Sequence, residues 1–280
     1  MNLFGLHHVS AIASSRSACE HFYGGLLGLE TAADAGEGTL AFDAGPERGG
    51  GVLSFVVSPG AAPGVAGRGL VHRLQWAVPD AAALDRWRRR LERAGVAVTA
   101  WLNGAGDPLA LRFSDPDGLE HELALPSAGE QRLVLIGVRA YAAGSVQSGD
   151  LLAGRLGFAA CGEGAWRVGA GPGEVRYGTE APPPLRPVEG AGSVRHVAWS
   201  CRPGEERAWR QRVIGMGATV SRLIDCDGYR CFFFREPDGV LFGVATLRGV
   251  PAEAGPRFEL PRPSEIPPRI ARPIGILAAA

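Results

Sequence analysis

A turn followed by a strand occurs twice in this chain, and the repeat limits the possible folds more than any other feature of the sequence. The first copy reads Phe113-Ser-Asp-Pro-Asp-Gly-Leu-Glu-His-Glu122, and the second reads Phe234-Arg-Glu-Pro-Asp-Gly-Val-Leu-Phe-Gly243. Proline fixes φ and the Asp-Gly pair lets the chain reverse, so each copy predicts a tight turn that returns as a strand. When the copies are aligned, Glu122 falls on Gly243. One unit therefore carries a carboxylate where the other has no side chain.

The segments before the two turns also match each other. Residues 71–78 and 194–200 alternate between polar and apolar as strands do, and each is followed by apolar residues at helical spacing. Trp87 and Trp209 are 122 residues apart, close to the spacing of the two turns, and near-constant offsets indicate duplication. The helix residues that we expect to be buried against sheets are Trp87, Leu91, Trp209 and Val213.

The whole repeat pattern predicts an α+β fold made of four units, each a strand, a helix and then several strands. A fainter match of residues 6–12 with 135–141 supplies the other two units. The units cover about 1–60, 66–126, 131–180 and 193–247, which we group into domains 1–126 and 131–247. Residues 248–280 are rich in Pro and Arg, and we expect them to form an extended C-terminal tail.

Composition excludes several classes of function. The 29 acidic and 29 basic residues balance, so the chain has no electrostatic footprint for nucleic acid or an anionic membrane. Every basic residue is arginine, and the absence of lysine excludes Schiff-base chemistry and a P-loop. The 5 cysteines form no CxxC pair, which fits a reducing compartment, and no apolar run is long enough to span a membrane. We therefore expect a cytoplasmic protein with neither nucleic-acid nor membrane partners.

Three histidines lie on the first strand of their units: His8, His72 and His196. Neighbouring strand residues point to opposite faces, so His7 and His8 should diverge, and the valine after both His8 and His196 favours His8 as the inward one. Two imidazoles and one carboxylate on neighbouring strands form a facial triad for Fe(II) or a similar ion. A single strand histidine more often satisfies a hydrogen bond in the core, but the repeated placement makes a ligand role about equally plausible.

A second group of candidates lies near the hairpin of the last unit. Cys226, Tyr229 and Cys231 could approach a metal there, although cysteine is also a common small core residue. No hydroxyl or thiol has an identifiable His/Asp relay, so the sequence gives no support for covalent nucleophilic catalysis.

With these motifs the chain resembles the vicinal-oxygen-chelate superfamily, in which βαβββ modules pair into half-open barrels around a metal. Within it, the chain is most similar to the four-module ring-cleaving dioxygenases of the hydroquinone type. The resemblance covers roughly residues 1–247 and rests on Leu6-His-His-Val-Ser-Ala-Ile12, Phe22-Tyr23, the two turn-strand copies and Val194-Arg-His-Val-Ala198. It implies four βαβββ modules paired into two half-open barrels.

The resemblance also implies a metal site held by two histidines and a glutamate. Carried over by position, the ligands are His8 and His196, and Gly243 occupies the position of the glutamate. Ser54, on the corresponding strand of the first module, does not replace that carboxylate. This assignment needs the first module to pair with the fourth, the arrangement that we prefer. If the first packs on the second instead, an intact triad of His8, His72 and Glu122 results.

Two functions of different class follow from this resemblance. The first is a ring-cleaving dioxygenase of the extradiol or hydroquinone type that uses Fe(II) or Mn(II) and acts on a small aromatic diol. In this enzyme the metal site would be degenerate, and Tyr229 would be a catalytic donor in the pocket. The alternative is a metal-free protein that binds a small molecule, like the resistance proteins of the same superfamily. The sequence leaves the assembly open, and a homodimer is one arrangement compatible with it.

Overall fold

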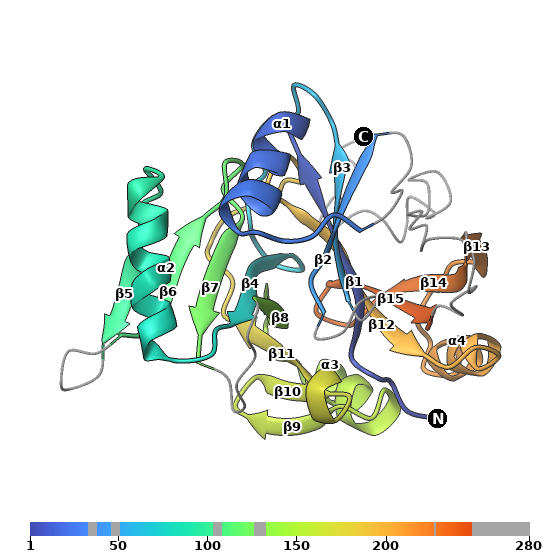
Figure 1. Ribbon diagram of the computed structural model, residues 1–280. Coiled ribbons are helices and arrows are strands. Elements are labelled where there is room, and N and C mark those ends of the chain that lie inside the picture. The colour runs from blue at the N-terminus through green and yellow to red at the C-terminus, as the bar shows by residue number, and fades with distance from the viewer. Residues whose placement is uncertain (33–37, 46–50, 103–107, 126–132, 227, 248–280) are drawn as a thin grey trace.

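The computed structural model describes residues 1–32, 38–45, 51–102, 108–125, 133–226 and 228–247 (Figure 1). The predicted tail, 248–280, lies outside these described residues. Among the helices that they form, none combines the length and the hydropathy that crossing a membrane requires.

Two curled sheets make up the described structure (Figure 1). The 7-stranded sheet has the order β13-β14-β15-β12-β1-β3-β2, and the 8-stranded sheet has the order β5-β6-β7-β4-β8-β11-β10-β9. The strands of the first sheet are β1 (Leu6–Ala13), β2 (Thr39–Asp43), β3 (Val52–Val57), β12 (Val194–Cys201), β13 (Ile224–Cys226), β14 (Tyr229–Arg235) and β15 (Leu241–Thr246). Those of the second are β4 (Val71–Ala77), β5 (Thr99–Leu102), β6 (Pro108–Ser114), β7 (Glu120–Ala124), β8 (Val134–Tyr141), β9 (Ala159–Gly162), β10 (Ala165–Val168) and β11 (Val175–Glu180).

Four βαβββ modules build these sheets, as the sequence predicted. In each module the first strand lies parallel to the last, and the middle strands follow outward. The first module differs because the strand after its helix is reduced to one bridge between Thr31 and Phe42.

The modules pair first with fourth and second with third. Val9 lies directly opposite Val197, which confirms the pairing that we preferred from the sequence. Each sheet therefore combines a module from 1–126 with one from 131–247, and the division of the chain between those ranges does not coincide with the division between the sheets.

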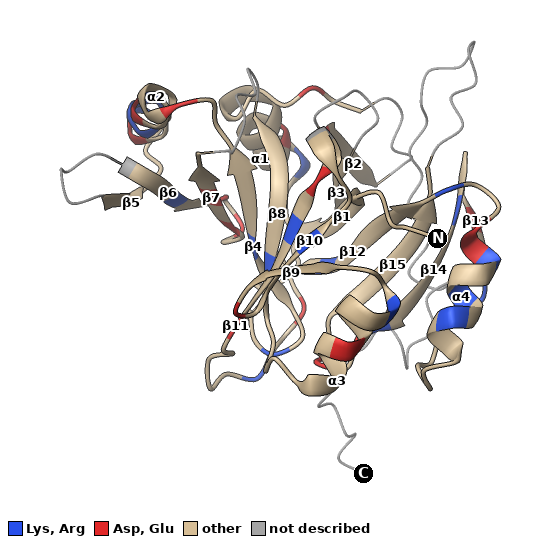
Figure 2. Cartoon of the chain, turned by 90° about the horizontal axis from the view of Figure 1, so that it is seen from below, with Lys and Arg blue, Asp and Glu red and all other residues tan. Residues whose placement is uncertain are grey.

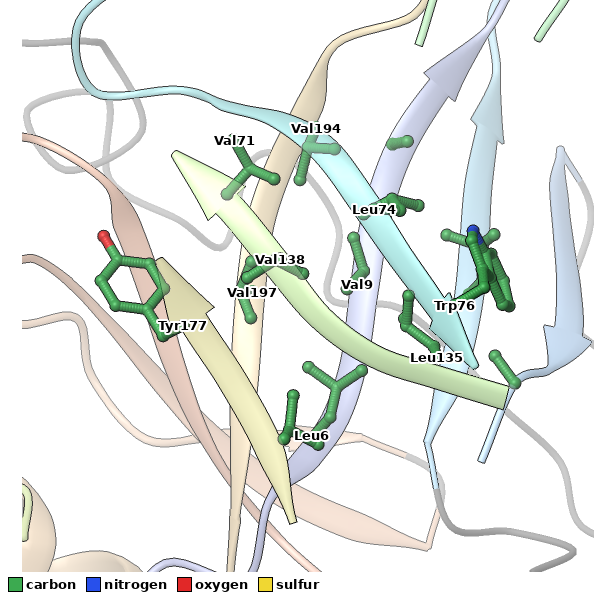
Figure 3. Close-up of a cluster of buried hydrophobic side chains, with 14 of the residues drawn as sticks. Leu6, Val9, Val71, Leu74, Trp76, Leu135, Val138, Tyr177, Val194 and Val197 are labelled. Carbon is green, nitrogen blue, oxygen red and sulfur yellow. The ribbon is translucent and has the colours of Figure 1, made fainter. Parts of the chain in front are cut away.

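A buried quartet joins the two sheets where the modules meet. Val9 and Val197 face each other in one sheet, Leu74 and Val138 face each other in the other, and all four are fully buried (Figure 3). Because these residues come from all four modules, neither sheet can bury its central strands without the other.

Short helices cover the outer strands and begin at side-chain caps. Ser15, Asp80 and Ser145 each accept a hydrogen bond from the backbone amide three residues on. The first and third modules continue from an α-helical turn into a π-helical segment at equivalent places. The helices are α1 (Arg16–Cys19), η1 (Glu20–Leu26), α2 (Ala81–Arg93), α3 (Val146–Gly149), η2 (Asp150–Arg155), η3 (Gly171–Gly173) and α4 (Glu206–Ile214).

Both repeated turns have the predicted form. The amide of Gly118 donates to the carbonyl of Asp115, and the amide of Gly239 donates to that of Glu236. Both glycines have positive φ, 90° and 107°, a conformation that glycine adopts without strain. Each acidic side chain also accepts hydrogen bonds from two backbone amides of its own turn, so the carboxylate fixes the turn from within.

The same turns fasten one sheet to the other. Asp117, from the second module, accepts hydrogen bonds from the amide (2.9 Å) and hydroxyl (2.5 Å) of Ser14 in the first module. Asp238, from the fourth module, accepts from the amide of Ser145 in the third at 3.0 Å, and Glu236 accepts from the Ser148 hydroxyl at 2.5 Å. These contacts form two pseudo-symmetric clamps, each joining a turn of one sheet to a helix start that belongs to the other.

The turns also bring Glu122 and Gly243 to equivalent positions. Glu122 lies opposite Arg112 and Gln75, and Gly243 lies opposite Phe233 and Ala198. The prediction that the two residues correspond is therefore confirmed.

Of the four helix residues expected to be buried, three are. Leu91, Trp209 and Val213 are fully buried, whereas Trp87 is only partly buried. Trp87 instead lines a pocket of about 270 Å³ together with Leu29 and Arg90, so part of its side chain stays exposed.

We predict that Trp209→Ala lowers the free energy of unfolding by roughly 3–5 kcal/mol, because a fully buried indole leaves a cavity. Trp87→Ala is the matched control and should cost clearly less. Both rings carry an arginine guanidinium 5.1 Å from the ring centroid, so the comparison isolates burial. Urea unfolding of both variants measures the difference, and equal losses would contradict the packing described here.

The buried turn carboxylate predicts a dependence of stability on pH. Burial raises the pKa of Asp115 to about 6, against the opposing hydrogen bonds from Tyr23 and from backbone amides. A carboxyl whose pKa is raised by folding stabilises the protein most below its unfolded pKa of about 4, and that stabilisation is lost as the pH rises through the folded pKa. The unfolding free energy of the wild type relative to Asp115→Asn should therefore fall by about 2–3 kcal/mol between pH 4 and pH 7. Urea titrations over this range measure it, with the exposed Asp150→Asn as control; a difference independent of pH would contradict the prediction.

Candidate functional site

Two of the predicted metal ligands meet in the middle of the seven-stranded sheet. His8 on β1 and His196 on β12 come from the first and fourth modules, and their Nε2 atoms lie 2.8 Å apart. Both side chains are buried, with His8 fully excluded from solvent. We call the face of the sheet that carries His8, Ser10, His196, Phe233 and Gly243 the histidine face.

His7 also reaches this site, which the sequence did not predict. Its Nδ1 lies 2.8 Å from Nδ1 of His8, although neighbouring strand residues normally point to opposite faces. The cause is an irregularity in the pairing of β1 with β12 between Leu6 and His8, which shifts the register by one residue. The expectation that His7 and His8 diverge was therefore wrong.

The three imidazoles form a continuous chain of nitrogen contacts. Within each contact one nitrogen must donate and the other accept, so the proton positions of His7, His8 and His196 are linked. Burial lowers the pKa of His196 to about 3, with a smaller contribution from the charge of Arg195. His196 is thus neutral at physiological pH, the form in which imidazole accepts a hydrogen bond or binds a metal.

Aromatic rings lie against the histidines. The ring of Tyr229 lies 4.7 Å from that of His7 and 6.2 Å from that of His8, and the ring of Phe233 lies 4.8 Å from that of His196. Tyr229 is thus brought to the predicted site. The apolar cluster that it joins, separate from the main core, consists of Ala41, Val52, Ala198, Ile224, Tyr229, Cys231, Phe233, Leu241 and Ala245.

The position of the missing carboxylate is filled by an aromatic ring. A Cβ placed on Gly243 would lie 2.9 Å from Cε1 of Phe233 and 3.0 Å from Cβ of Ala198, closer than side-chain contacts allow. Phe233 lies directly opposite Gly243 in the neighbouring strand, so the ring covers the glycine. Glycine here is a packing requirement of Phe233, and the space is not left open for another donor.

Two serines complete the polar groups of the histidine face. Ser54, at the equivalent position of the first module, donates its hydroxyl to the carbonyl of Val9 at 3.0 Å, so it is used within the sheet and does not replace the carboxylate. Ser10 lies opposite both His196 and Ser54 and is fully buried. Its hydroxyl has no hydrogen-bond partner among the described residues, and neither has Nδ1 of His196.

The alternative triad of His8, His72 and Glu122 is not formed. His8 belongs to the seven-stranded sheet, whereas His72 and Glu122 lie on β4 and β7 of the other. His72 stacks on Tyr141 with ring centroids 3.8 Å apart, and its ring nitrogens each lie 3.5 Å from a carboxylate oxygen, one of Glu120 and one of Glu180. These contacts hold His72 within its own sheet.

The residue that corresponds to His196 in the second module is Arg73. Gln75 pairs with Glu122 in the second module, and Ala198 pairs with Gly243 in the fourth, so Gln75 and Ala198 are equivalent. The offset between β4 and β12 is therefore one residue shorter than an alignment of His72 with His196 suggests. The Arg73 guanidinium lies 2.9 Å from Glu180, 3.1 Å from Glu120 and 3.7 Å from Glu122. The eight-stranded sheet therefore has an ion-pair network, with Arg73 and Glu122 buried and Glu120 and Glu180 partly exposed, at the position equivalent to the histidine pair.

Glu122 is held in that network as a carboxylate. Burial alone would raise its pKa, but hydrogen bonds from Gln75 and Arg112 and the charges of Arg112 and Arg73 outweigh burial and lower it. The hydrogen bonds from both residues measure 2.7 Å. Its charge is thus neutralised by arginine, which leaves it no metal-binding role here.

The residues at the histidine face do not complete a metal site for the implied Fe(II) or Mn(II). Two nitrogens 2.8 Å apart, each at the usual 2.0–2.1 Å from an ion, would subtend roughly 85° and so could be adjacent ligands. A third protein donor is absent: among the residues that the structure describes, no three His, Cys, Asp or Glu side chains are grouped to hold an ion. Two neutral imidazoles also leave the charge of a divalent ion uncompensated in a buried place.

Residues 5–123 match the model of the Glyoxalase/Bleomycin resistance protein/Dioxygenase superfamily, and the chain therefore carries a domain of this superfamily.

Three proteins of Bacillus subtilis (strain 168) are similar over most of the chain. The protein named putative ring-cleaving dioxygenase MhqO is 28% identical over 272 residues, which cover 86% of this chain and 84% of MhqO. Those named putative ring-cleaving dioxygenases MhqA and MhqE are 27% and 26% identical, and each alignment covers 88% of both proteins.

Solved structures agree with this grouping. The crystal structure of a putative dioxygenase from Bacillus subtilis has a TM-score of 0.76 and 26% identity, covering 93% of this chain and 92% of that one. Glyoxalase I from Zea mays, at 14% identity, has a TM-score of 0.63 over 86% of this chain and 92% of its own, and it shows the shared fold alone.

Because Phe233 occupies the carboxylate position, we predict that Gly243→Glu destabilises the protein by about 1–3 kcal/mol, the usual cost of overpacking. Removing the ring as well should relieve the clash and complete a facial triad. The variant Phe233→Ala/Gly243→Glu should then bind Mn(II) at least about tenfold more tightly than Phe233→Ala alone. Thermal unfolding and Mn(II) titration measure the two effects. A Gly243→Glu variant as stable as the wild type would show that the ring does not hold this position.

Proposed function

We propose that the histidine face binds a small aromatic diol, in a protein of the ring-cleaving dioxygenase type whose metal-ligand set is incomplete. The observation that carries the proposal is the pair of buried atoms without hydrogen-bond partners among the described residues, His196 Nδ1 and Ser10 Oγ. A buried donor or acceptor left unpaired costs about 1–3 kcal/mol. The hydroxyl groups of a diol would supply the missing partners.

The surroundings of these atoms favour an aromatic ligand. Tyr229 and Phe233 place rings beside His7 and His196, and both rings belong to one apolar cluster. Edge-to-face and offset contacts with such rings are worth about 0.5–1.5 kcal/mol beyond the area that they bury. In this proposal His196 and Ser10 orient the hydroxyl groups, Tyr229 is a further donor at the edge of the ring, and His7 and His8 set the proton positions of the histidine chain.

Metal-dependent ring cleavage is the second candidate function. It is supported by the names of the three similar Bacillus subtilis proteins and by the spacing of His8 and His196, which suits two adjacent ligands. Fe(II) or Mn(II) would supply the activation of oxygen and of the diol. Gly243 argues against it, since the ion would depend on an external anion for both its third donor and its charge balance.

A binding experiment with metal-free protein tests the first proposal. Catechol and hydroquinone should bind the chelator-treated protein, and Ser10→Ala and His196→Gln should each weaken binding by about 5–150-fold, the equivalent of 1–3 kcal/mol. Calorimetric titration measures the affinities. His72→Gln is the matched control, because it changes a buried first-strand histidine in the other sheet and should leave the affinity unchanged.

The outcome of this titration distinguishes metal-free diol binding from metal-dependent ring cleavage. No binding without metal, together with diol-dependent oxygen uptake after addition of Fe(II), would reject metal-free binding and favour ring cleavage. If His72→Gln weakens diol binding as much as His196→Gln does, the ligand is not specific to the seven-stranded sheet and the proposal is refuted.

A further inference from the structure

A pocket of about 300 Å³ lies where the segments that precede β4 and β12 meet. Its other walls are the turn before β7, the start of β4 and the end of β8. No residue of the histidine face lines it, so it is separate from the site proposed for the diol. At about 30 Å³ for each heavy atom, a pocket of this size holds a ligand of roughly ten heavy atoms.

Backbone hydrogen bonds fix the walls of this pocket. The amide of Gly64 donates to the carbonyl of Ala191 at 2.9 Å, which joins the two segments to each other. The amide of Tyr141 donates to the carbonyl of Leu70, also at 2.9 Å, which joins the first segment to β8. The pocket is therefore formed by the fold before any ligand arrives, as binding pockets usually are.

His72 brings two unsatisfied nitrogen atoms to this pocket. Its side chain is 2% exposed, and neither Nδ1 nor Nε2 makes a hydrogen bond among the described residues. Nδ1 lies 3.5 Å from Glu120 and Nε2 lies 3.5 Å from Glu180. A neutral imidazole has one N–H, so one of its nitrogens must face a carboxylate with two acceptors opposed. A donor placed between Nδ1 and Glu120 would satisfy both.

The charge of the lining favours a cation as that donor. Glu120 and Asp117 line the pocket, and no arginine is among its described lining residues. The imidazole of His72 and the guanidinium of Arg73 outweigh burial and lower the pKa of Glu120 to about 2, so it is ionised at neutral pH. Arg73 contacts Oε2 of Glu120, which leaves Oε1 for a ligand. Asp117 accepts from the uncharged Ser14, so its charge is not neutralised there.

The rest of the pocket is apolar. Leu70, Val71 and Leu119 line it, and all three are buried. Pockets of this kind take ligands with an apolar body and a few polar groups that set their orientation.

We propose that this pocket binds a primary ammonium ion carried on a small apolar group. The ammonium donates hydrogen bonds to Nδ1 of His72 and to the carboxylate of Glu120, and the apolar body lies against Leu70 and Leu119. His72 then directs its remaining N–H towards Glu180. The stack of His72 on Tyr141 holds the imidazole in the plane that this arrangement needs.

Calorimetric titration of the full-length protein with phenethylammonium tests the proposal. The neutral analogue 2-phenylethanol has the same shape and should bind at least about tenfold more weakly, because it lacks the charge that strengthens a hydrogen bond to a carboxylate. Glu120→Gln keeps the contacts of Arg73 with Glu122 and Glu180 and should weaken phenethylammonium binding at least about fivefold. The side chain of Glu120 is 44% exposed, so solvent screening keeps this loss below that of a buried charge.

A second variant tests the location without changing a charge. Ala66 is exposed at the edge of the pocket, so Ala66→Trp should fold normally, fill the space and abolish binding. This variant decides if circular dichroism shows that Glu120→Gln is misfolded.

Two controls separate this pocket from other carboxylates and from the histidine face. Glu163→Gln removes an exposed carboxylate outside the pocket, and His196→Gln changes the diol site; both should leave phenethylammonium binding unchanged. Equal affinity for the alcohol and the ammonium, or unchanged binding in Ala66→Trp, would overturn the assignment. An effect of Glu163→Gln or His196→Gln as large as that of Glu120→Gln would also overturn it. Failure of diol binding would leave it standing.

Discussion

The contact on which the arrangement depends most is the carboxylate of each repeated turn bound to a helix start in the other sheet. Asp117 holds Ser14 at the end of β1, and Asp238 holds Ser145 after β8. Each bond therefore ties the last hairpin of one module to the first strand of its neighbour in the chain. A hydrogen bond to a charged group is worth about 1.5–3 kcal/mol, and its direction fixes a geometry that apolar packing alone would leave loose. The quartet of Val9, Leu74, Val138 and Val197 can then pack between sheets that are already aligned (Figure 3).

Duplication has given the two sheets the same frame but different charge at equivalent positions. In the eight-stranded sheet the equivalents of His196 and Gly243 are Arg73 and Glu122, which bind each other within a larger ion-pair network. In the seven-stranded sheet, β15 carries no charged residue. Figure 2 shows charged residues on the helices instead, on α2, which packs on β6 of the eight-stranded sheet, and on α4, which packs on β14 and β15. A guanidinium buried among carboxylates excludes a metal ion, because the site already contains its cation. The neutral histidine face has no such cation and suits an uncharged aromatic ligand.

The sequence predicted the modules and the turns, because these depend on periodicity and on turn residues that act locally. The pairing of the first module with the fourth is a long-range feature, and it was expected only from the resemblance to the ring-cleaving dioxygenases. The sequence could not predict that His7 and His8 point the same way, since one shifted residue in the pairing of β1 reverses the rule of alternation. The sequence alignment matched His72 to His196, whereas the residue at the equivalent position is Arg73. This error of one residue becomes visible only from the register of each first strand with the last strand of its module. Phe233 was missed because nothing in a run of three phenylalanines shows which ring covers Gly243.

The loss of the carboxylate at Gly243 changes what a bound metal would mean in this protein. A facial triad contains one charged ligand, and two imidazoles without that carboxylate leave the charge of a divalent ion uncompensated in a buried place. Oxygen chemistry needs a redox-active ion with open positions and a ligand set that holds it, and His8 and His196 supply two of the three protein donors of a facial triad. An ion found with the purified protein therefore does not by itself identify a reaction at the histidine face.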